Sequence, residues 1–248
     1  MKKSFLIVFT AALMAVFFSC SSKEYKIGDI VMTNGSVLSV EEYKSYSGNE
    51  KPVAVIFSTT GAYLEQNSSR VLGVGLYGAK EPLRFAKPDS DGDNTNMLHN
   101  RADVISQDYD VVSGVYQNQG FVGDLDGFDS WKDVLEHDTD AANGMAEIYP
   151  AYNFAINYGS NNKCEKFDNK KWYLPSIAEL YELYTVLPVV NESIEACGGD
   201  KIKNAVWSSS QTLYRKNVEF HVNMSNGEVT EAFKDAQANV RSVYRFAK

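Results

Sequence analysis

The most regular alternation of apolar and polar residues lies in the last third of the chain. Between residues 176 and 185, apolar side chains recur at intervals of three and four, as on one face of a helix: Ile177, Leu180, Tyr181 and Tyr184. Ser176 and Glu179 have the spacing of a capping box, in which each side chain accepts a free backbone N–H of the first turn. Pro188 cannot continue the hydrogen-bond ladder of a helix. The pattern therefore predicts a helix that begins at Ser176 and ends before Pro188.

Strand patterns occur on both sides of this helix. Alternating apolar residues at 218, 220, 222 and 224 are followed by Asn226-Gly227, a two-residue turn that is typical of a hairpin. Near the start, residues 29–33 and 36–39 flank a second such turn at Asn34-Gly35. Residues 52–58 and 70–77 are rich in β-branched side chains and predict buried strands. We expect the apolar face of the helix to pack on the strand at residues 218–224.

Three motifs follow one another in this region. They are WYLPSIAEL at Trp172–Leu180, VWSSS at Val206–Ser210 and VRSVYRF at Val240–Phe246. In this order and spacing the chain resembles the C-terminal domain family named for the Lcl adhesin, within the C-type-lectin-like and formylglycine-generating-enzyme superfamily. Residues 27–39 and 52–61 resemble, more loosely, secreted lipoproteins of Bacteroidetes type.

The resemblance implies an α+β fold, specifically a C-type-lectin-like domain with a twisted antiparallel sheet and one or two packed helices. It covers residues 27–248 as a single domain. None of the three motifs is catalytic, and the function of the family is mostly undescribed.

The first residues predict export and a lipid anchor. Lys2 and Lys3 precede an apolar run from Phe5 to Phe18, which is too short to span a bilayer as a mature helix. Residues 1–19 therefore read as a signal peptide, Cys20 as the lipidated cysteine, and residues 20–26 as a short tether. Each buried methylene of an acyl chain adds about 0.8 kcal/mol of membrane affinity. We expect an outer-membrane lipoprotein of the cell envelope, on either side of the membrane. The alternative is an ordinary secretory signal in which Cys20 is incidental.

The charge of the chain argues against one class of partner. The formal net charge is −8, and loss of Lys2 and Lys3 with the signal peptide makes it −10. Phosphate binding needs clustered Lys and Arg, so nucleic acid is not expected as a partner.

Two cysteines remain after Cys20. Cys164 and Cys197 bracket the predicted helix, and a disulfide between them would join its two ends to the body in an oxidising compartment. The alternative is two unpaired buried thiols. A zinc site is not expected, because none of the three histidines has ligand spacing to a cysteine.

An acidic stretch in the middle of the chain has the beginning of a calcium loop. Asp89, Asp91 and Asp93 are spaced like the first three ligands of such a loop. The pattern then departs from an EF-hand, because Asn94 stands where Gly is usual and Asn100 stands where a bidentate Glu belongs. Calcium is the only cofactor that the sequence suggests, and it would need ligands from another loop.

A second acidic segment, GDLDGFDSW, contains Asp124 and Asp126. Together with Trp131 and Tyr116 these residues could form a ligand site, because sugar rings stack on exposed aromatic faces and their hydroxyls bind carboxylates. The alternative for both acidic segments is a turn followed by a helix cap. Tyr109, Phe121 and Phe128 are further candidates for exposed aromatic side chains.

Catalytic patterns are weak. The serines at 208–210 with His221 lack a G-x-S-x-G elbow, and Glu179 with Glu182 is typical of a solvated helix face. The sequence therefore predicts a lipid-anchored, non-catalytic binding module whose ligand is a glycan, a host protein or an envelope component. The alternatives are a structural or assembly subunit and an enzyme, for example a hydrolase, whose site the sequence hides.

Overall fold

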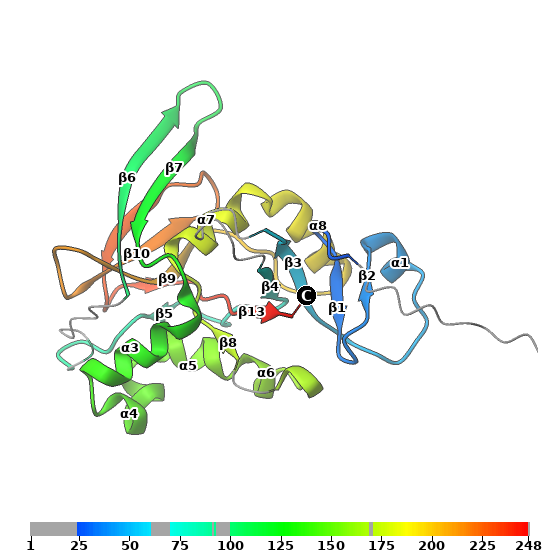
Figure 1. Cartoon of the computed structure of the whole chain (residues 1–248), viewed down its shortest axis with the longest axis horizontal. Helices are drawn as coiled ribbons and strands as arrows, with labels where there is room; N and C mark the ends of the chain where they lie inside the picture. Colours follow the sequence, from blue (N-terminus) through cyan, green and yellow to red (C-terminus); the bar gives the residue numbers. More distant parts are fainter. Residues whose placement is uncertain (1–23, 61–69, 91, 93–99, 169–170, 248) are drawn as a thin grey trace, which may run out of the picture.

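The chain forms a mixed α+β structure around two sheets that are almost entirely antiparallel, which confirms the expected α+β class. The computed structural model describes residues 24–60, 70–90, 92, 100–168 and 171–247 (Figure 1). The predicted signal peptide and Cys20 lie outside these residues. Among the helices within these ranges, none has the length and apolar character needed to cross a bilayer.

The first sheet has six strands in the order β2-β1-β3-β4-β13-β8, so it joins strands from the two ends of the chain. Its central strands β3 and β4 are buried except at Pro52, as their β-branched sequences predict. Asn34-Gly35 connects β1 to β2, which confirms the hairpin predicted near the start of the chain. The strands are β1 (Ile30–Met32), β2 (Val37–Leu38), β3 (Pro52–Ser58), β4 (Val71–Gly75), β8 (Trp172–Tyr173) and β13 (Val243–Phe246).

The second sheet has five strands in the order β11-β10-β9-β6-β7. Strands β10 and β11 form the second predicted hairpin around Asn226-Gly227, and Gly227 has the positive φ of 77° that such a turn requires. The pairing of β6 with β9 is parallel. The strands are β6 (Arg101–Asp110), β7 (Val115–Gly123), β9 (Ala205–Thr212), β10 (Val218–Asn223) and β11 (Val229–Phe233), and a separate short pair joins β5 (Leu83–Arg84) to β12 (Gln237–Ala238).

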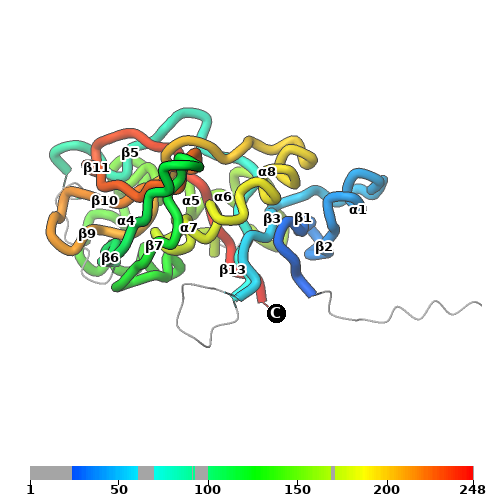
Figure 2. Tube along the Cα trace, turned by 90° about the horizontal axis from the view of Figure 1, so that it is seen from above, coloured from blue at the N-terminus to red at the C-terminus, as the bar shows by residue number. Residues whose placement is uncertain are grey.

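Helices cover the sheets in two groups. Figure 1 shows α3 to α6 together below the sheets, and α7 and α8 following one another between the β6–β7 hairpin and β3; Figure 2 shows α1 beside α8 at one end of the molecule. The helices are α1 (Val40–Lys44), α3 (Ser130–His137), α4 (Ala141–Ile148), α5 (Pro150–Ile156), α6 (Tyr158–Asn161), α7 (Ile177–Thr185) and α8 (Leu187–Ala196), with short 3₁₀ turns η1 (Gly127–Asp129) and η2 (Glu165–Phe167).

The predicted helix at Ser176 is α7. Ser176 is its N-cap, and the capping box with Glu179 is formed as expected. Its apolar face lies in the main cluster with Phe220, Val222 and Met224 of the β10 region, so the predicted packing is also confirmed. Pro188 lies in the first turn of the next helix, α8, where its missing N–H leaves no hydrogen bond unmade.

The three sequence motifs lie against one another. Strand β8 pairs with β13, which brings Trp172 opposite Tyr244. The VWSSS strand β9 reaches the start of α7, because Ser209 N donates to Pro175 O at 2.8 Å and Ile177 N donates to Ser210 Oγ at 3.0 Å. The motifs therefore form one continuous piece of the core.

The two cysteines are free in the structure, so the expected disulfide is not formed. Cys164 belongs to the apolar cluster around Trp172, whereas Cys197 packs against the separate cluster around α7. Both thiols are unpaired, as in the alternative that the sequence left open, although Cys164 is buried and Cys197 is only half-buried.

Candidate functional site

The acidic segment after β7 is a tight loop built from its own aspartates. Asp124 Oδ1 accepts a hydrogen bond from Asp126 N at 3.0 Å, and Asp126 Oδ1 accepts one from Phe128 N at 3.1 Å. These are local side-chain-to-backbone turns, and the second one caps η1. The structure thus contains the turn and cap that the sequence offered as an alternative to a ligand site.

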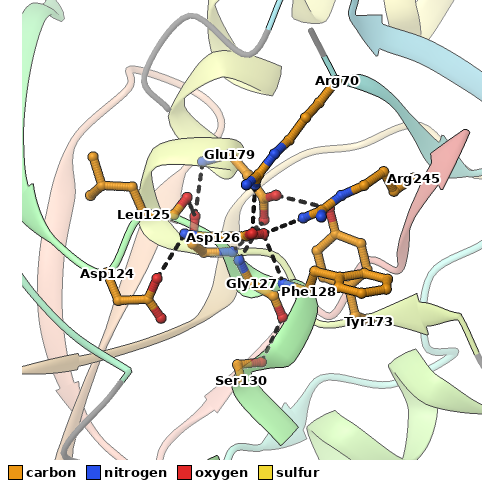
Figure 3. A network of polar contacts seen from close by, with 11 residues as sticks. Arg70, Asp124, Leu125, Asp126, Gly127, Phe128, Ser130, Tyr173, Glu179 and Arg245 are labelled. Carbon is orange, nitrogen blue, oxygen red and sulfur yellow. Dashed lines mark hydrogen bonds and ion pairs between the residues drawn. The ribbon is translucent and has the colours of Figure 1, made fainter. Parts of the chain in front are cut away.

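Asp126 is also held between two arginines from distant parts of the chain (Figure 3). Its Oδ2 lies 2.5 Å from Arg70 Nη1, and its Oδ1 accepts a hydrogen bond from Arg245 Nη2. The Arg245 guanidinium in turn lies 4.3 Å from the centre of the Phe128 ring. Both carboxylate oxygens are therefore occupied within the protein, so Asp126 fixes the loop to the first sheet instead of facing a ligand.

Glu179 connects the same loop to α7. Its Oε2 accepts hydrogen bonds from Ser176 N at 2.9 Å and Gly127 N at 3.2 Å, and its Oε1 accepts one from the Tyr173 hydroxyl at 2.8 Å. Burial raises the pKa of Glu179 to about 7, and the negative charge of Asp126 contributes to the same rise. The residue that the sequence placed on a solvated helix face is a buried structural carboxyl.

Asp124, whose carboxylate accepts the bond from Asp126 N in Figure 3, also lines an open cavity of about 350 Å³. Burial raises the pKa of Asp124 to about 6, although the bond from Asp126 N acts in the opposite direction. The wall of the cavity is mostly acidic and consists of Asn100, Asp124, Asp129, Lys132, Asp133 and Glu136. Nowhere in the described residues do three or more His, Cys, Asp or Glu side chains gather as a metal site would require.

The predicted calcium loop can be followed only in part. Asp89 has a left-handed backbone with φ of 57°, which suits a turn. Asp91 and Asp93 lie outside the described residues, so the calcium site stays a prediction.

The aromatic residues of the expected ligand site are separated from one another. Trp131 packs on Tyr149 and Tyr152, with ring centres 5.6 and 5.0 Å away, and is half-buried against the apolar cluster that includes α5. Tyr116 lies in β7 and donates from its hydroxyl to Glu228 Oε1 at 3.3 Å. Among the described residues that line the Asp124 cavity, Asp124 is the member of the expected set of four, and Trp131 and Tyr116 contact other parts of the structure.

The most unusual surface belongs to β6 and β7, which project from the body as a long hairpin that we call the arm (Figure 1). One face of the arm packs on the body, where Val104 and Phe121 contact the main cluster. Its outer face exposes 68% of Ile105 and 52% of Tyr109. At its tip, Val111 is 83% and Val112 96% exposed.

The turn at the tip does not need these valines. Asp110 accepts hydrogen bonds from Val112 N at 2.9 Å and from the Ser113 hydroxyl at 2.7 Å, and Gly114 supplies the positive φ of 70°. Turn positions favour Gly, Asn, Asp and Ser, whereas β-branched residues favour strands. Val111 and Val112 are therefore unfavourable residues for a turn, and they are not buried either. A local preference that is broken without a gain in packing is expected at functional positions.

The arm is also acidic. Asp103, Asp108 and Asp110 lie along β6, and its one basic residue, Arg101, lies at the base where β6 meets β9. The exposed apolar tip is therefore flanked by negative charge alone. Sequence reasoning missed this surface, although DVVSG at residues 110–114 carried the signal: turn residues surrounding two valines.

The chain was also compared with known proteins, and neither the protein-family models nor the curated proteins gave a match.

Proposed function

We propose that this protein is a lipid-anchored, non-catalytic binding module of the cell envelope, and that the arm binds a partner protein. The observation that carries the proposal is the exposure of Val111 and Val112 at a turn that Asp110, Ser113 and Gly114 already hold. Exposed apolar side chains grouped on a projecting element are typical of protein contact sites.

The energetics support contact with an apolar groove. Full burial of a valine side chain is worth about 1.5–3 kcal/mol relative to leaving it exposed. Two valines at one tip, with Tyr109 behind them, can therefore act as the small central set that dominates the affinity of an interface. The inner face of the arm is fixed to the β10–β11 turn, since Tyr116 N donates to Asn226 O at 2.7 Å, so little ordering remains for the binding step.

The negative charge of the arm indicates which kind of partner it can bind. The aspartates along β6 would be repelled by an anionic lipid surface, whereas they complement a groove rimmed by Lys or Arg. We therefore assign the arm to a protein partner with a basic rim around an apolar groove, rather than to a membrane.

The anchor and the finer fold form the rest of the proposal. The Cys20 motif supports attachment to the outer membrane through acyl chains, and the mutual contacts of the three motifs support a C-type-lectin-like domain. Labelling of cells with a palmitate analogue should mark the wild-type protein and not a Cys20→Ala variant. Equal labelling of both would refute the anchor without touching the role of the arm.

Cross-linking in intact cells tests the arm. A photoreactive amino acid is placed at Val112 and, as a matched control, at Tyr214, which is 80% exposed and follows strand β9. We expect a discrete protein adduct from position 112 that is absent from position 214 and is lost when Val111→Asp is added.

Three results have different meanings. The same adducts from both positions, or none from position 112, would contradict the proposal. A lipid adduct at position 112 would contradict the assignment to a protein. An adduct with twice the mass of the chain would make a second copy the partner, which is the assembly-subunit alternative.

A further inference from the structure

A second cavity, of about 540 Å³, has the opposite charge to the rest of the molecule. It lies where three connecting segments meet: the one after β4, the one after α8 and the one before β13. Its wall holds four cationic side chains and one acidic one, in a protein with a net charge of −8. The lining residues are Gly78, Ala79, Lys80, Gly199, Asp200, Lys201, Lys203, Asn239 and Arg241.

Arg241 forms the buried part of this wall. It is only 5% exposed, and its guanidinium donates to Leu76 O at 3.3 Å, to Asp200 O at 2.7 Å and to Lys201 O at 3.1 Å. These acceptors are backbone carbonyls, which carry partial charges only, so the hydrogen bonds fix the guanidinium without cancelling its charge. Burial lowers the pKa of Arg241 to about 10, so it remains protonated at neutral pH.

The lysines of the wall add positive charge to that of Arg241. Lys201 is bound to Glu195 at 3.1 Å on the surface, whereas Lys80 and Lys203 are exposed and make no ion pair with another described residue. The acidic member, Asp200, is partly engaged because its Oδ2 accepts a hydrogen bond from Gly78 N at 3.3 Å. The charge of Asp200 also acts on Arg241 and raises its pKa against the effect of burial, whereas Lys80 and Lys203 keep their charges at the same cavity.

A glycine of the wall lets the backbone pass close to Arg241. A Cβ atom added at Gly78 would lie 3.3 Å from the Arg241 guanidinium carbon, so the glycine lets the chain pass directly over that group. None of the described residues that line this wall is aromatic or a large apolar residue, which disfavours an apolar ligand. Clustered cations in a concave site focus positive potential and suit compact, highly charged anions.

We propose that this cavity binds a small polyanion that carries phosphate or sulfate groups, with Lys80 and Lys203 as its direct ligands and Arg241 as the fixed charge behind them. The site is independent of the arm, so either proposal can fail without the other.

Calorimetric titration of the purified protein at low ionic strength tests the site. The probes are pyrophosphate, a heparin-derived sulfated disaccharide, and phosphatidylcholine vesicles that contain phosphatidylglycerol. The test variant combines Lys80→Ala with Lys203→Ala, and the control combines Lys44→Ala with Lys132→Ala, two exposed lysines that lie outside the cavity. Both variants lose the same charge, and their melting temperatures are measured to show that they are folded.

We expect saturable binding of at least one probe, a Kd at least tenfold higher in the test variant, and a change of less than twofold in the control. Binding of the vesicles alone, with the same dependence on Lys80 and Lys203, would support the site and identify a lipid headgroup as the source of the anion. The absence of saturable binding of all three probes, or an equal loss in both variants, would overturn the proposal.

Discussion

Two aspartates of one loop, Asp124 and Asp126, should respond in opposite ways to the same substitution. Asp126→Asn removes a charge that lies between Arg70 and Arg245, whereas Asp124→Asn removes a charge that burial disfavours. We expect the first variant to be less stable than the wild type at neutral pH and the second to be more stable.

The size of the Asp126 effect follows from its contacts. The side chains of Asp126, Arg70 and Arg245 are between 22% and 24% exposed, so their ion pairs are largely shielded from solvent. Hydrogen bonds to charged groups contribute about 1.5–3 kcal/mol each. Asparagine keeps the size of the side chain and the oxygen that accepts from Phe128 N, so part of the network survives. We expect the free energy of unfolding to fall by about 2–3 kcal/mol.

The sign of the Asp124 effect follows from its pKa. The folded-state pKa of about 6 lies above the ordinary value of 3.8, so the folded state binds the proton more tightly than the unfolded state. This contribution to stability is complete below pH 3.8 and is lost as the pH rises through 6. Because Asp124 is partly open to solvent, we expect Asp124→Asn to gain only about 1 kcal/mol at pH 7.5. The gain should shrink as the pH falls to 5.

Urea unfolding followed by tryptophan fluorescence measures both effects, at pH 7.5 and at pH 5. Glu41→Gln is the control, because Glu41 is an exposed acid in α1 and loses the same charge. A change below 0.5 kcal/mol for Asp126→Asn, or a clear loss of stability for Asp124→Asn at pH 7.5, would refute the roles assigned to the two carboxylates.

Three further outcomes are expected from other parts of the structure. Glu219 and Lys234 form a fully buried pair 3.5 Å apart. In urea unfolding, Glu219→Leu should lower the free energy of unfolding by about 3–5 kcal/mol, and adding Lys234→Met should restore most of that loss. If the second substitution restores nothing, the broken pair is not the cause of the loss. Replacing Val111 and Val112 by Ser should change the free energy of unfolding by less than about 0.5 kcal/mol, because both side chains are exposed; a larger loss would give the valines a structural role. Burial raises the pKa of Cys164 to about 12, so mass spectrometry should find it unmodified by a thiol reagent at pH 8 until urea is added; fast labelling of the folded protein would contradict its placement in the core.

The local part of the fold could be predicted from the sequence. The capping box at Ser176 and the turn at Asn226-Gly227 each depend on residues within a few positions of one another, and both were confirmed. The helix ends before Pro188 as predicted, but the sequence pattern did not reveal that a second helix, α8, begins there. Proline both stops one helix and suits the first turn of the next, and neighbouring residues alone do not say which follows.

The long-range part could not be predicted. Arg70 and Arg245 meet Asp126 from positions more than fifty residues away in each direction, so spacing gave no sign that this aspartate was occupied. Trp131 was expected in a ligand site, but it lies in α3 and packs on Tyr149 and Tyr152, which are distant from it in the sequence. Strands β6 and β7 were also missed. The two β-bulges in their pairing interrupt the regular alternation of apolar and polar residues that marks a strand.

The affinity of the purified protein for the partner cross-linked at position 112 is the most direct test of the binding role of the arm. The comparison is between the wild type, the double variant Val111→Ser with Val112→Ser, and Tyr214→Ser as a control for loss of exposed apolar surface elsewhere. We expect a Kd at least tenfold higher for the double variant, a loss of about 1.4 kcal/mol or more, and little change for the control. An unchanged Kd for the double variant would contradict the account.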